Sequence, residues 1–395
     1  MQRYDAYRSA VGDRELPLAY LDREALDANI RTTQRRASDL PVRIASKSIR
    51  CPDVLEYVLD HDTFEGVMCY TGHEAAYLAS RGFDDLLVAY PVVHPAELER
   101  VCDCRAEGAE VTLMIDSGAH VERIGAVAEE RGVEVPVCID VDMSTEHFGI
   151  HFGVHRSDIQ TPEEALDLAE TVTTTEGVSL RGVMGYEAQI AGLPDDDPSN
   201  NPVANGLMRR LKSRSAPEMR RRREVVVAAL ERGGYDLDFV NGGGTGSVEV
   251  TRTDTSVTEV TVGSGFYAPS LFDYYRSFDY EPAAGYAVEV VRRPSPDIYT
   301  CRGGGFVASG SPGEDKTPTV HLPDGASLTD NEGAGEVQTP VEYDGPVGLE
   351  LGDPVFLRHA KAGELCTNVT HLHVIDGEEI VDRYQTYRGD GECFL

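Results

Sequence analysis

The feature of this sequence that most constrains its fold is a regular alternation of short apolar runs and longer amphipathic stretches between residues 41 and 266. Such alternation is typical of a parallel sheet in which each strand is followed by a helix. Eight of the short runs have the residue types of strands, and eight is the strand number of a (β/α)8 barrel. They lie at residues 42–46, 65–70, 85–90, 111–116, 135–141, 179–186, 237–243 and 258–265.

The connections between these runs carry apolar residues at helical spacing, as in PDVLEYVLD (52–60). Thr161 and Pro162 open another connection with residue types that favour the N-cap and the first helical turn. A longer helix is expected over about 205–232, after a loop at 191–203 that is rich in Pro, Asp and Asn. We expect this helix to reach over the mouth of the barrel.

The helical rhythm ends near residue 285, and Gly- and Pro-rich turns then separate strand-like pieces such as DPVFLRHA and THLHVIDG. This change predicts a second domain built from strands alone. The predicted fold class is therefore α/β, a TIM-like (β/α)8 barrel followed by a C-terminal all-β domain. We predict an N-terminal strand that bridges to the β domain over 1–22, the barrel over 23–284 and the β domain over 285–395.

The charge balance excludes some partners. Sixty-eight acidic residues against thirty-six basic ones give a net charge of −32, whereas a nucleic-acid binder presents a basic patch or stripe. The basic residues include only four lysines, Lys47, Lys212, Lys316 and Lys361. A strongly acidic, lysine-poor surface favours a halophilic protein that stays soluble in a salty cytoplasm.

Targeting signals are not evident. No run of about 18 apolar residues occurs, and the first twenty residues lack the basic start and apolar core of a signal peptide. The eight cysteines form no CxxC pair, and several stand inside apolar runs, where Cys behaves as a small hydrophobe. We therefore expect a cytoplasmic protein with mostly reduced cysteines and no membrane partner.

Lys47 is the first candidate for chemistry. It stands in RIASKSIR, at the carboxyl end of the first barrel strand, which is the end where barrel enzymes place functional groups. Lysine forms Schiff bases when it is partly desolvated or near positive charge, and Arg43 and Arg50 are close in sequence. The alternative is an ordinary exposed lysine at a strand end. The scarcity of lysine elsewhere favours the functional interpretation.

Two glycine-rich turns form the second candidate site. NGGGTGS (241–247) follows the seventh run, and GSGFY (263–267) follows the eighth. Barrels commonly hold phosphate at these two strand ends, where backbone N–H groups face the anion. Each turn alone is also consistent with a plain tight turn. Together with Lys47 they describe an aldehyde cofactor held by its phosphate on one side and its imine on the other, which indicates pyridoxal 5′-phosphate (PLP).

At this point the sequence resembles a known family, the fold-type III PLP-dependent enzymes that share the alanine racemase barrel. It is most similar to the D-threonine aldolase and D-serine dehydratase branch, and within it to a group known as amino acid deaminase/aldolase. The resemblance spans nearly the whole chain. Its carriers are ASKS at Lys47 and the segments at 138–155, 182–192, 241–247, 263–275, 332–340 and 358–366.

The resemblance implies roles for further residues. Lys47 would be the Schiff-base lysine, and Tyr186 would contact the cofactor ring or the substrate unless it is a core tyrosine. Arg156 lies near the place where racemases have an arginine that assists substrate or cofactor, although a surface arginine fits equally. The residues implied in phosphate binding, with Tyr267 as a supporting donor, are Gly244, Thr245, Gly265, Phe266 and Tyr267.

The resemblance also implies a divalent metal in the aldolase and dehydratase branch, held by a His and, two residues later, an Asp or Cys. Here His359 stands at the expected place, but the residue two positions on is Lys361, and Cys366 is the nearest second ligand. An imidazole and a thiolate would suit zinc better than magnesium, with manganese as another choice. Both residues are equally consistent with structural roles in the core. His371 and His373 share a strand face, which is more often incidental than a ligand pair.

These implications predict a PLP-dependent lyase that acts at the α-carbon of a small amino acid, by retro-aldol cleavage or by β-elimination. One alternative is an amino acid racemase, which would need a second base such as Tyr384 or Tyr387 from a partner subunit. Another is a non-catalytic PLP carrier, against which the large β domain counts. The resemblance further implies a homodimer.

Overall fold

The computed structural model describes residues 2–147, 149–198, 200–310 and 313–394. The chain divides into two compact units. We call Thr33–Lys47 and Tyr57–Gly263, together with Phe394, the barrel unit. Residues 2–32, Ser48–Glu56 and Ser264–Cys393 form the β unit. Each is described by itself below.

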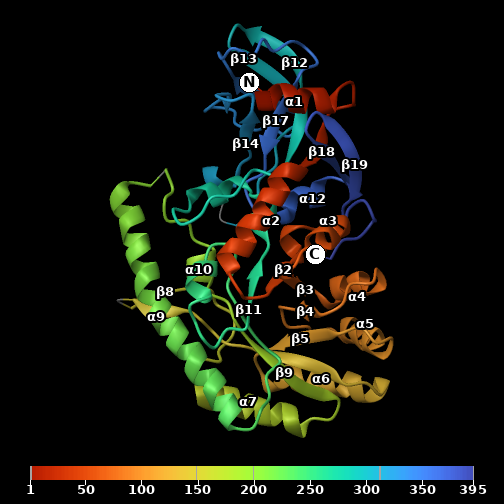
Figure 1. Cartoon of the computed structure of the whole chain (residues 1–395), viewed down its shortest axis with the longest axis vertical. Coiled ribbons are helices and arrows are strands. Elements are labelled where there is room, and N and C mark those ends of the chain that lie inside the picture. Colours follow the sequence, from red (N-terminus) through yellow and green to blue (C-terminus); the bar gives the residue numbers. More distant parts are fainter. Residues whose placement is uncertain (1, 148, 199, 311–312, 395) are drawn as a thin grey trace. The chain divides into compact units, whose positions relative to one another are not determined.

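Eight parallel strands close the barrel in the order β10-β11-β2-β3-β4-β5-β6-β9. Every pairing between neighbours is parallel, and the eight strands coincide within a few residues with the eight predicted runs. The predicted TIM-like barrel is therefore confirmed (Figure 1). The strands are β2 (Val42–Ala45), β3 (Phe64–Cys69), β4 (Leu86–Val88), β5 (Val111–Ile115), β6 (Val135–Asp140), β9 (Val178–Gly185), β10 (Phe239–Gly242) and β11 (Glu259–Val262).

Helices follow the strands along the chain and pack around the barrel. The predicted start of one is confirmed, because Thr161 is the N-cap and forms a capping box with Glu164. The expected long helix is α9 (Pro202–Arg232). The other helices of this unit are α4 (Gly72–Ser80), α5 (Pro95–Ala106), α6 (Gly118–Arg131), α7 (Pro162–Thr174), α8 (Ala188–Ala191) and α10 (Val248–Thr251), while α2 (Arg23–Ala37) and α3 (Pro52–Leu59) run from one unit into the other.

The middle of α9 packs on the loops that follow β6 and β9. Arg222 donates to the backbone oxygens of Asp142 and Ser144, and Ser215 lies 2.9 Å from the Thr145 hydroxyl. Thr145 belongs to a two-stranded hairpin, β7 (Thr145–His147) and β8 (Ile150–Phe152), inserted after β6. The long helix therefore covers loops at the carboxyl ends of the strands.

The β unit is built around a nine-stranded sheet. Its N-terminal strand β1 (Leu18–Asp22) pairs antiparallel with β12 (Ala284–Ser295) and parallel with β18 (His371–Asp376). A helix that was not predicted, α1 (Gln2–Val11), precedes β1 and buries Tyr4 and Tyr7. The remaining elements are α11 (Ser264–Tyr267), η2 (Ser270–Tyr274), β13 (Ile298–Arg302), η3 (Glu314–Lys316), β14 (Thr319–Leu322), β15 (Ser327–Leu328), β16 (Gln338–Glu342), β17 (Pro354–Arg358), η4 (Ala362–Glu364), α12 (Leu365–Asn368) and β19 (Glu379–Gln385).

Two further sequence expectations concern the cysteines and membranes. In the described residues the eight cysteines form no disulfide bonds; seven of them are buried and Cys393 is exposed. Across the residues that the structure describes, no helix combines the length and the apolar character needed to span a bilayer.

A buried ion pair ties three segments of the barrel together. Arg43 on β2 is 2% exposed and donates two hydrogen bonds to the Glu259 carboxylate on β11, at 2.7 and 2.9 Å. The same guanidinium donates to the carboxylate and the backbone oxygen of Asp85, just before β4. Such a fork-shaped contact needs arginine, because lysine cannot donate in this bidentate geometry.

We expect Arg43→Met to lower the free energy of unfolding by about 3–5 kcal/mol, because it leaves the Glu259 carboxylate buried without its partner. Urea unfolding followed by circular dichroism measures this change. Arg100→Met, at an exposed position of α5, is the matched control and should cost less than about 0.5 kcal/mol. Equal effects of the two substitutions would contradict a structural role for the ion pair.

Candidate active site

Four side chains or turns of interest lie where barrel strands end. Lys47 stands in η1 (Ser46–Ser48), directly after β2, and Tyr90 stands two residues after β4. Tyr186 directly follows β9, and Gly244 comes two residues after β10. The carboxyl ends of parallel strands meet at one face of a closed barrel, which we call the barrel rim. Arg156, in the loop after β8, reaches the same rim through contacts given below.

The Lys47 amine forms a hydrogen bond with a tyrosine. Its Nζ atom lies 2.8 Å from the Tyr90 hydroxyl and 5.4 Å from the centre of the Tyr90 ring. Both side chains are half-buried. Tyr90 was not among the predicted site residues. The available signal was its position as the last residue of the predicted strand 85–90, the same kind of position that Tyr186 occupies.

Arg156 lies over both rim tyrosines. Its guanidinium carbon is 5.4 Å from the Tyr90 ring centre and 5.3 Å from that of Tyr186, a distance at which cations and aromatic faces attract. The loop that carries it is tied to β6, since the Ser157 hydroxyl donates to the Asp140 backbone oxygen at 2.6 Å. The structure therefore brings Lys47, Arg156 and Tyr186 together, with Tyr90 between them.

The pKa values of Tyr90 and Tyr186 shift in opposite directions in this environment. Burial raises the pKa of Tyr90, but the charges and hydrogen bonds of Lys47 and Arg156 outweigh burial and bring the pKa below its ordinary value. Burial raises the pKa of Tyr186 to about 12, because Arg156 only partly offsets it. Tyr90 is thus the tyrosine of this rim that can ionise at lower pH.

Asp140, the last residue of β6, adds a second titratable group. Burial raises its pKa to about 7; the Arg156 charge lowers the pKa, and the carboxylates of Asp116 and Asp142 raise it further. A carboxyl that titrates near neutral pH can accept or donate a proton under physiological conditions. Sequence reasoning did not single it out, because its burial depends on the closed barrel.

The glycine turn after β10 is held by a buried network. Arg223 of α9 donates to the carboxylates of Glu187 and Asp254 and to the Gly185 backbone oxygen. Glu187 in turn accepts from the Gly243 amide at 2.7 Å. Arg223, Glu187 and Asp254 are all at most 2% exposed in their side chains. We refer to these three residues as the Arg223 network; it fixes the turn beside Tyr186.

This turn has room only for glycine at position 244. A Cβ atom on Gly244 would lie 2.9 Å from the Ala191 side chain and 3.1 Å from the Tyr186 ring. The Gly244 amide donates to the Ser247 hydroxyl at 3.1 Å, and the Thr245 backbone oxygen accepts from Arg36 at 2.8 Å. Thr245 itself is buried. The turn is therefore closely packed against Ala191 and Tyr186.

The other predicted phosphate-binding residues belong to the β unit. A Cβ on Gly265 would lie 2.7 Å from the Tyr280 ring, and Phe266 and Tyr267 are fully buried. The Tyr267 hydroxyl donates to the Ile49 backbone oxygen at 3.2 Å. Because these residues and the turn after β10 lie in different units, their assembly into one phosphate site stays a prediction.

The two predicted metal ligands flank Tyr267. The His359 ring centre is 6.4 Å from that of Tyr267, and the Cys366 thiol is 3.9 Å from its hydroxyl. Burial and the nearby Arg358 charge lower the pKa of His359 to about 4, so its ring is neutral, and among the described residues neither ring nitrogen has a hydrogen-bond partner. Burial raises the pKa of the Cys366 thiol to about 12. No cluster of three or more His, Cys, Asp or Glu side chains suited to a metal occurs within the described ranges.

Comparison with known proteins decides the family. Residues 21–270 match the model of the alanine racemase N-terminal domain. This chain belongs to that family. The predicted resemblance to the fold-type III PLP-dependent enzymes is thereby confirmed.

Individual members of the family differ in their chemistry. The chain is 26% identical over 269 residues to 3-hydroxy-D-aspartate aldolase of Paracoccus denitrificans, a match that covers 68% of this chain and 63% of that protein. D-threonine aldolase from Filomicrobium marinum has the same fold, with a TM-score of 0.79, 18% identity and 96% of each chain covered. D-threo-3-hydroxyaspartate dehydratase from Delftia sp. HT23 gives a TM-score of 0.75 at 20% identity, covering 95% of this chain and 98% of that one.

Within this alanine racemase-like barrel, Tyr90 should ionise below the ordinary tyrosine range because Lys47 and Arg156 stabilise the phenolate. Ultraviolet titration of the cofactor-free protein should show a tyrosinate that appears early, and Tyr90→Phe should abolish it. Lys47→Met should move it to higher pH, since one cation is lost. Tyr186→Phe is the matched control and should leave the early tyrosinate in place. An early tyrosinate that persists in Tyr90→Phe would disprove the assignment.

Proposed function

We propose that this protein is a PLP-dependent lyase that acts at the α-carbon of a small 3-hydroxy-D-amino acid, with cleavage to glycine and an aldehyde or elimination to ammonia and a keto acid. The observation that carries the proposal is the Lys47 amine at the barrel rim, 2.8 Å from the Tyr90 hydroxyl. Family membership and the names of the aldolase relatives support the choice of reaction.

The rim residues of the barrel unit fit PLP. Lys47 offers the amine for a covalent link, Tyr186 offers a ring face, and the glycine turn at Gly244 and Thr245 packs closely beside that ring. When bound, PLP supplies an electron sink that stabilises negative charge at the substrate α-carbon. We assign Gly265, Phe266 and Tyr267 to the same phosphate site as part of the proposal.

Lys47 and Tyr90 would exchange one proton with each other. An ammonium has no lone pair, so Lys47 must lose a proton from Nζ before it can act as nucleophile or base. The Tyr90 hydroxyl lies within hydrogen-bond distance of that atom, and its phenolate is stabilised by Arg156. Proton transfer over this distance requires no solvent. We therefore assign Tyr90 as the partner that takes and returns the Lys47 proton.

Arg156 and Asp140 would act on the substrate side. Arg156 carries a permanent positive charge and reaches the rim between the two tyrosines, so it can hold the substrate carboxylate. Asp140 has a pKa raised to about 7 by burial, which suits an acid that protonates a leaving oxygen or a base that takes a hydroxyl proton. An aldol cleavage requires removal of the 3-hydroxyl proton, whereas an elimination requires removal of the α-proton and protonation of the 3-oxygen, which leaves as water.

A divalent metal on His359 and Cys366, zinc or manganese, is a separate part of the proposal. The unpartnered nitrogens of the buried His359 ring fit one ligand. The neutral Cys366 thiol and the lack of a third His, Cys, Asp or Glu near them among the described residues do not fit a complete site, since metals such as zinc take about four ligands. We assign no step of the reaction to this metal.

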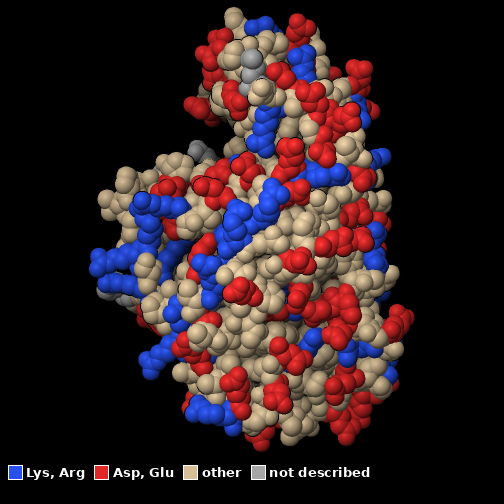
Figure 2. All heavy atoms as spheres, viewed as in Figure 1, with Lys and Arg blue, Asp and Glu red and all other residues tan. Residues whose placement is uncertain are grey.

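We further propose that the protein is a cytoplasmic homodimer adapted to high salt. The eight free cysteines support a reducing compartment. Acidic side chains are spread over the face shown in Figure 2, while basic side chains gather along α9. A surface of this composition repels itself unless salt screens it.

The function is tested with purified protein, PLP and a panel of D-threonine, 3-hydroxy-D-aspartate and D-serine, with and without a chelator. We expect glycine and an aldehyde, or ammonia and a keto acid, from at least one of them. Lys47→Ala should lower the rate at least about a hundredfold and abolish covalent cofactor binding, whereas Lys316→Ala, the matched lysine control, should do neither.

Interconversion of L- and D-alanine alone would indicate a racemase, and bound cofactor without turnover would indicate a carrier. Loss of activity with chelator, restored by zinc or manganese, would support the metal.

The acidic surface predicts that salt stabilises the fold. The Debye length falls from about 10 Å at 0.1 M to about 3 Å at 1 M salt, so repulsion within a chain of net charge −32 weakens over that range. We expect Tm to rise steadily between these concentrations of potassium chloride, measured by scanning calorimetry. A series of equal osmolality in sorbitol is the control, and an equal rise there would contradict charge screening as the cause.

A further inference from the structure

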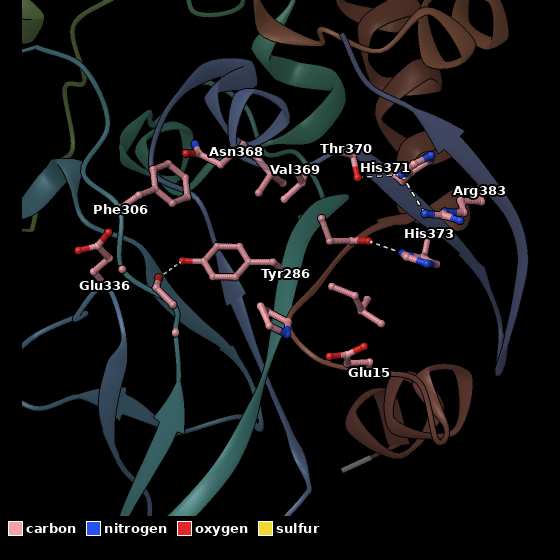
Figure 3. Close-up of a pocket in the computed structure, with 17 residues that line it drawn as sticks. Glu15, Tyr286, Phe306, Glu336, Asn368, Val369, Thr370, His371, His373 and Arg383 are labelled. Carbon is pink, nitrogen blue, oxygen red and sulfur yellow. Dashed lines mark hydrogen bonds between the residues drawn. The ribbon is translucent and has the colours of Figure 1, made fainter. Parts of the chain in front are cut away.

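A pocket of about 560 Å³ opens in the β unit. It lies where β1 begins, between β12, β18 and β19 and the loop at 303–306 (Figure 3). All of its lining residues belong to the β unit, so it shares none with the rim site of Lys47. Its volume falls within the range of small-molecule sites, about 300–1,000 Å³.

One side of the pocket offers hydrogen-bond donors. His371 and His373 alternate along β18 and so share a face, and Arg383 is the cross-strand neighbour of His373 on β19. The Arg383 guanidinium donates to Nδ1 of His371 at 3.0 Å. Because that nitrogen accepts, the remaining proton of a neutral His371 ring is on Nε2. Arg383 and His371 together present N–H groups suited to a carboxylate.

His373 presents the opposite polarity. Its Nδ1 atom lies 3.2 Å from the Ala19 backbone oxygen, to which it can only donate. Burial, followed by the charges of Arg383 and Arg14, lowers the pKa of His373, so its ring is neutral and Nε2 keeps a lone pair. Burial and Arg383 also lower the pKa of His371. The two rings therefore offer one donor and one acceptor rather than two positive charges.

Two acidic side chains line the pocket and offset the positive charge of Arg383. Glu15 and Glu336 line the pocket together with Arg383, and all three are exposed at its mouth. In the described ranges none of the three forms an ion pair with an opposite charge. Two carboxylates against one guanidinium disfavour a phosphate or another polyanion. A ligand with one negative and one positive group matches this charge pattern.

An apolar wall completes the pocket. The rings of Tyr286 and Phe306 are 6.0 Å apart, and Figure 3 shows Tyr286 between Phe306 on one side and His373 on the other. The Tyr286 hydroxyl donates to the Gly304 backbone oxygen. Gly304 has a φ of +114°, and a Cβ there would lie 2.9 Å from the Thr339 hydroxyl, so this loop is closely fitted. The wall is thus preformed for an aromatic or branched apolar group.

We propose that this pocket binds a free α-amino acid with an apolar side chain. Its carboxylate accepts from Arg383 and His371. Its ammonium donates to Glu15 and to Nε2 of His373, and its side chain packs on Tyr286 and Phe306. The site is additional to the proposed lyase site and does not depend on the cofactor.

The test uses the full chain with Lys47→Ala, which removes covalent chemistry at the barrel rim, and isothermal titration calorimetry. The probes are L- and D-phenylalanine, with phenylacetate and phenethylamine, each of which lacks one charge. We expect at least one enantiomer of phenylalanine to bind. Each single-charge analogue should bind at least about tenfold more weakly than that enantiomer. Absence of binding by either enantiomer, or equal binding of phenylacetate, would overturn the proposal.

Two substitutions locate the site. Arg383→Gln and Glu15→Gln, both at exposed positions, should each weaken phenylalanine binding by about tenfold. Arg388→Gln makes the same charge change as Arg383→Gln on an exposed residue of the β unit outside the pocket, and should leave binding unchanged. Full affinity in Arg383→Gln and Glu15→Gln would place the ligand elsewhere and refute the proposal. Since these measurements need no turnover, a failure of the lyase function would leave their outcome unaffected.

Discussion

The hydrogen bond between the Lys47 amine and the Tyr90 hydroxyl is the contact on which the chemistry that we propose for the barrel rim depends. It joins residues that follow β2 and β4, two strands separated by β3 in the barrel order. Such a contact requires β2, β3 and β4 to pair parallel, so that the carboxyl ends of β2 and β4 lie at the same edge. Arg156 then adds a second cation to the same phenol. The fold thereby turns a residue that is ordinarily neutral into one that can hold a negative charge beside an amine.

A rigid backbone around the rim makes this arrangement possible. The Arg223 network is buried, and buried charges are costly unless every one is paired and hydrogen-bonded. Here Arg223 has two carboxylate partners, and Glu187 also accepts from the Gly243 amide. The network connects α9, the segment after β9 and the turn after β10. Its contribution is geometric, since it fixes where Tyr186 and the glycine turn lie relative to one another within the barrel unit.

The sequence predicted the parts of this molecule that follow from local pattern. Apolar runs separated by amphipathic stretches predicted all eight barrel strands, the position at a strand end pointed to Lys47, and the family resemblance pointed to Tyr186. Tyr90 also ends a predicted strand, but a tyrosine at a strand end is equally consistent with a place in the core, so its position alone does not identify it. Asp140 could not be found, since its titration near neutrality depends on burial within the closed barrel.

Helix α1 shows a different limit of sequence reasoning. Its buried residues Tyr4, Tyr7 and Val11 have helical spacing, but the segment is polar overall, and only docking in the β unit supplies its apolar environment. Tyr7 also bonds to the Asp22 carboxylate at the end of β1. The β-unit pocket has the same origin, because Ala19 and His373, from opposite ends of the chain, are brought together by the pairing of β1 with β18. Pairings between distant segments are not encoded in any local pattern.

Lysine is scarce in this chain, and the lysine at the rim can do chemistry that arginine cannot. Arginine stays charged at any physiological pH, and its planar fork suits the buried pairs of Arg43 and Arg223. Lysine can become a neutral amine, so it is the basic residue that can both carry a proton and release it. At the rim the two types stand side by side, with Arg156 as a fixed charge and Lys47 as a variable one. Tyr90 lies between them and contacts both. In the proposed reaction, a proton that leaves Lys47 would therefore move to a group whose negative charge is stabilised by the Arg156 guanidinium.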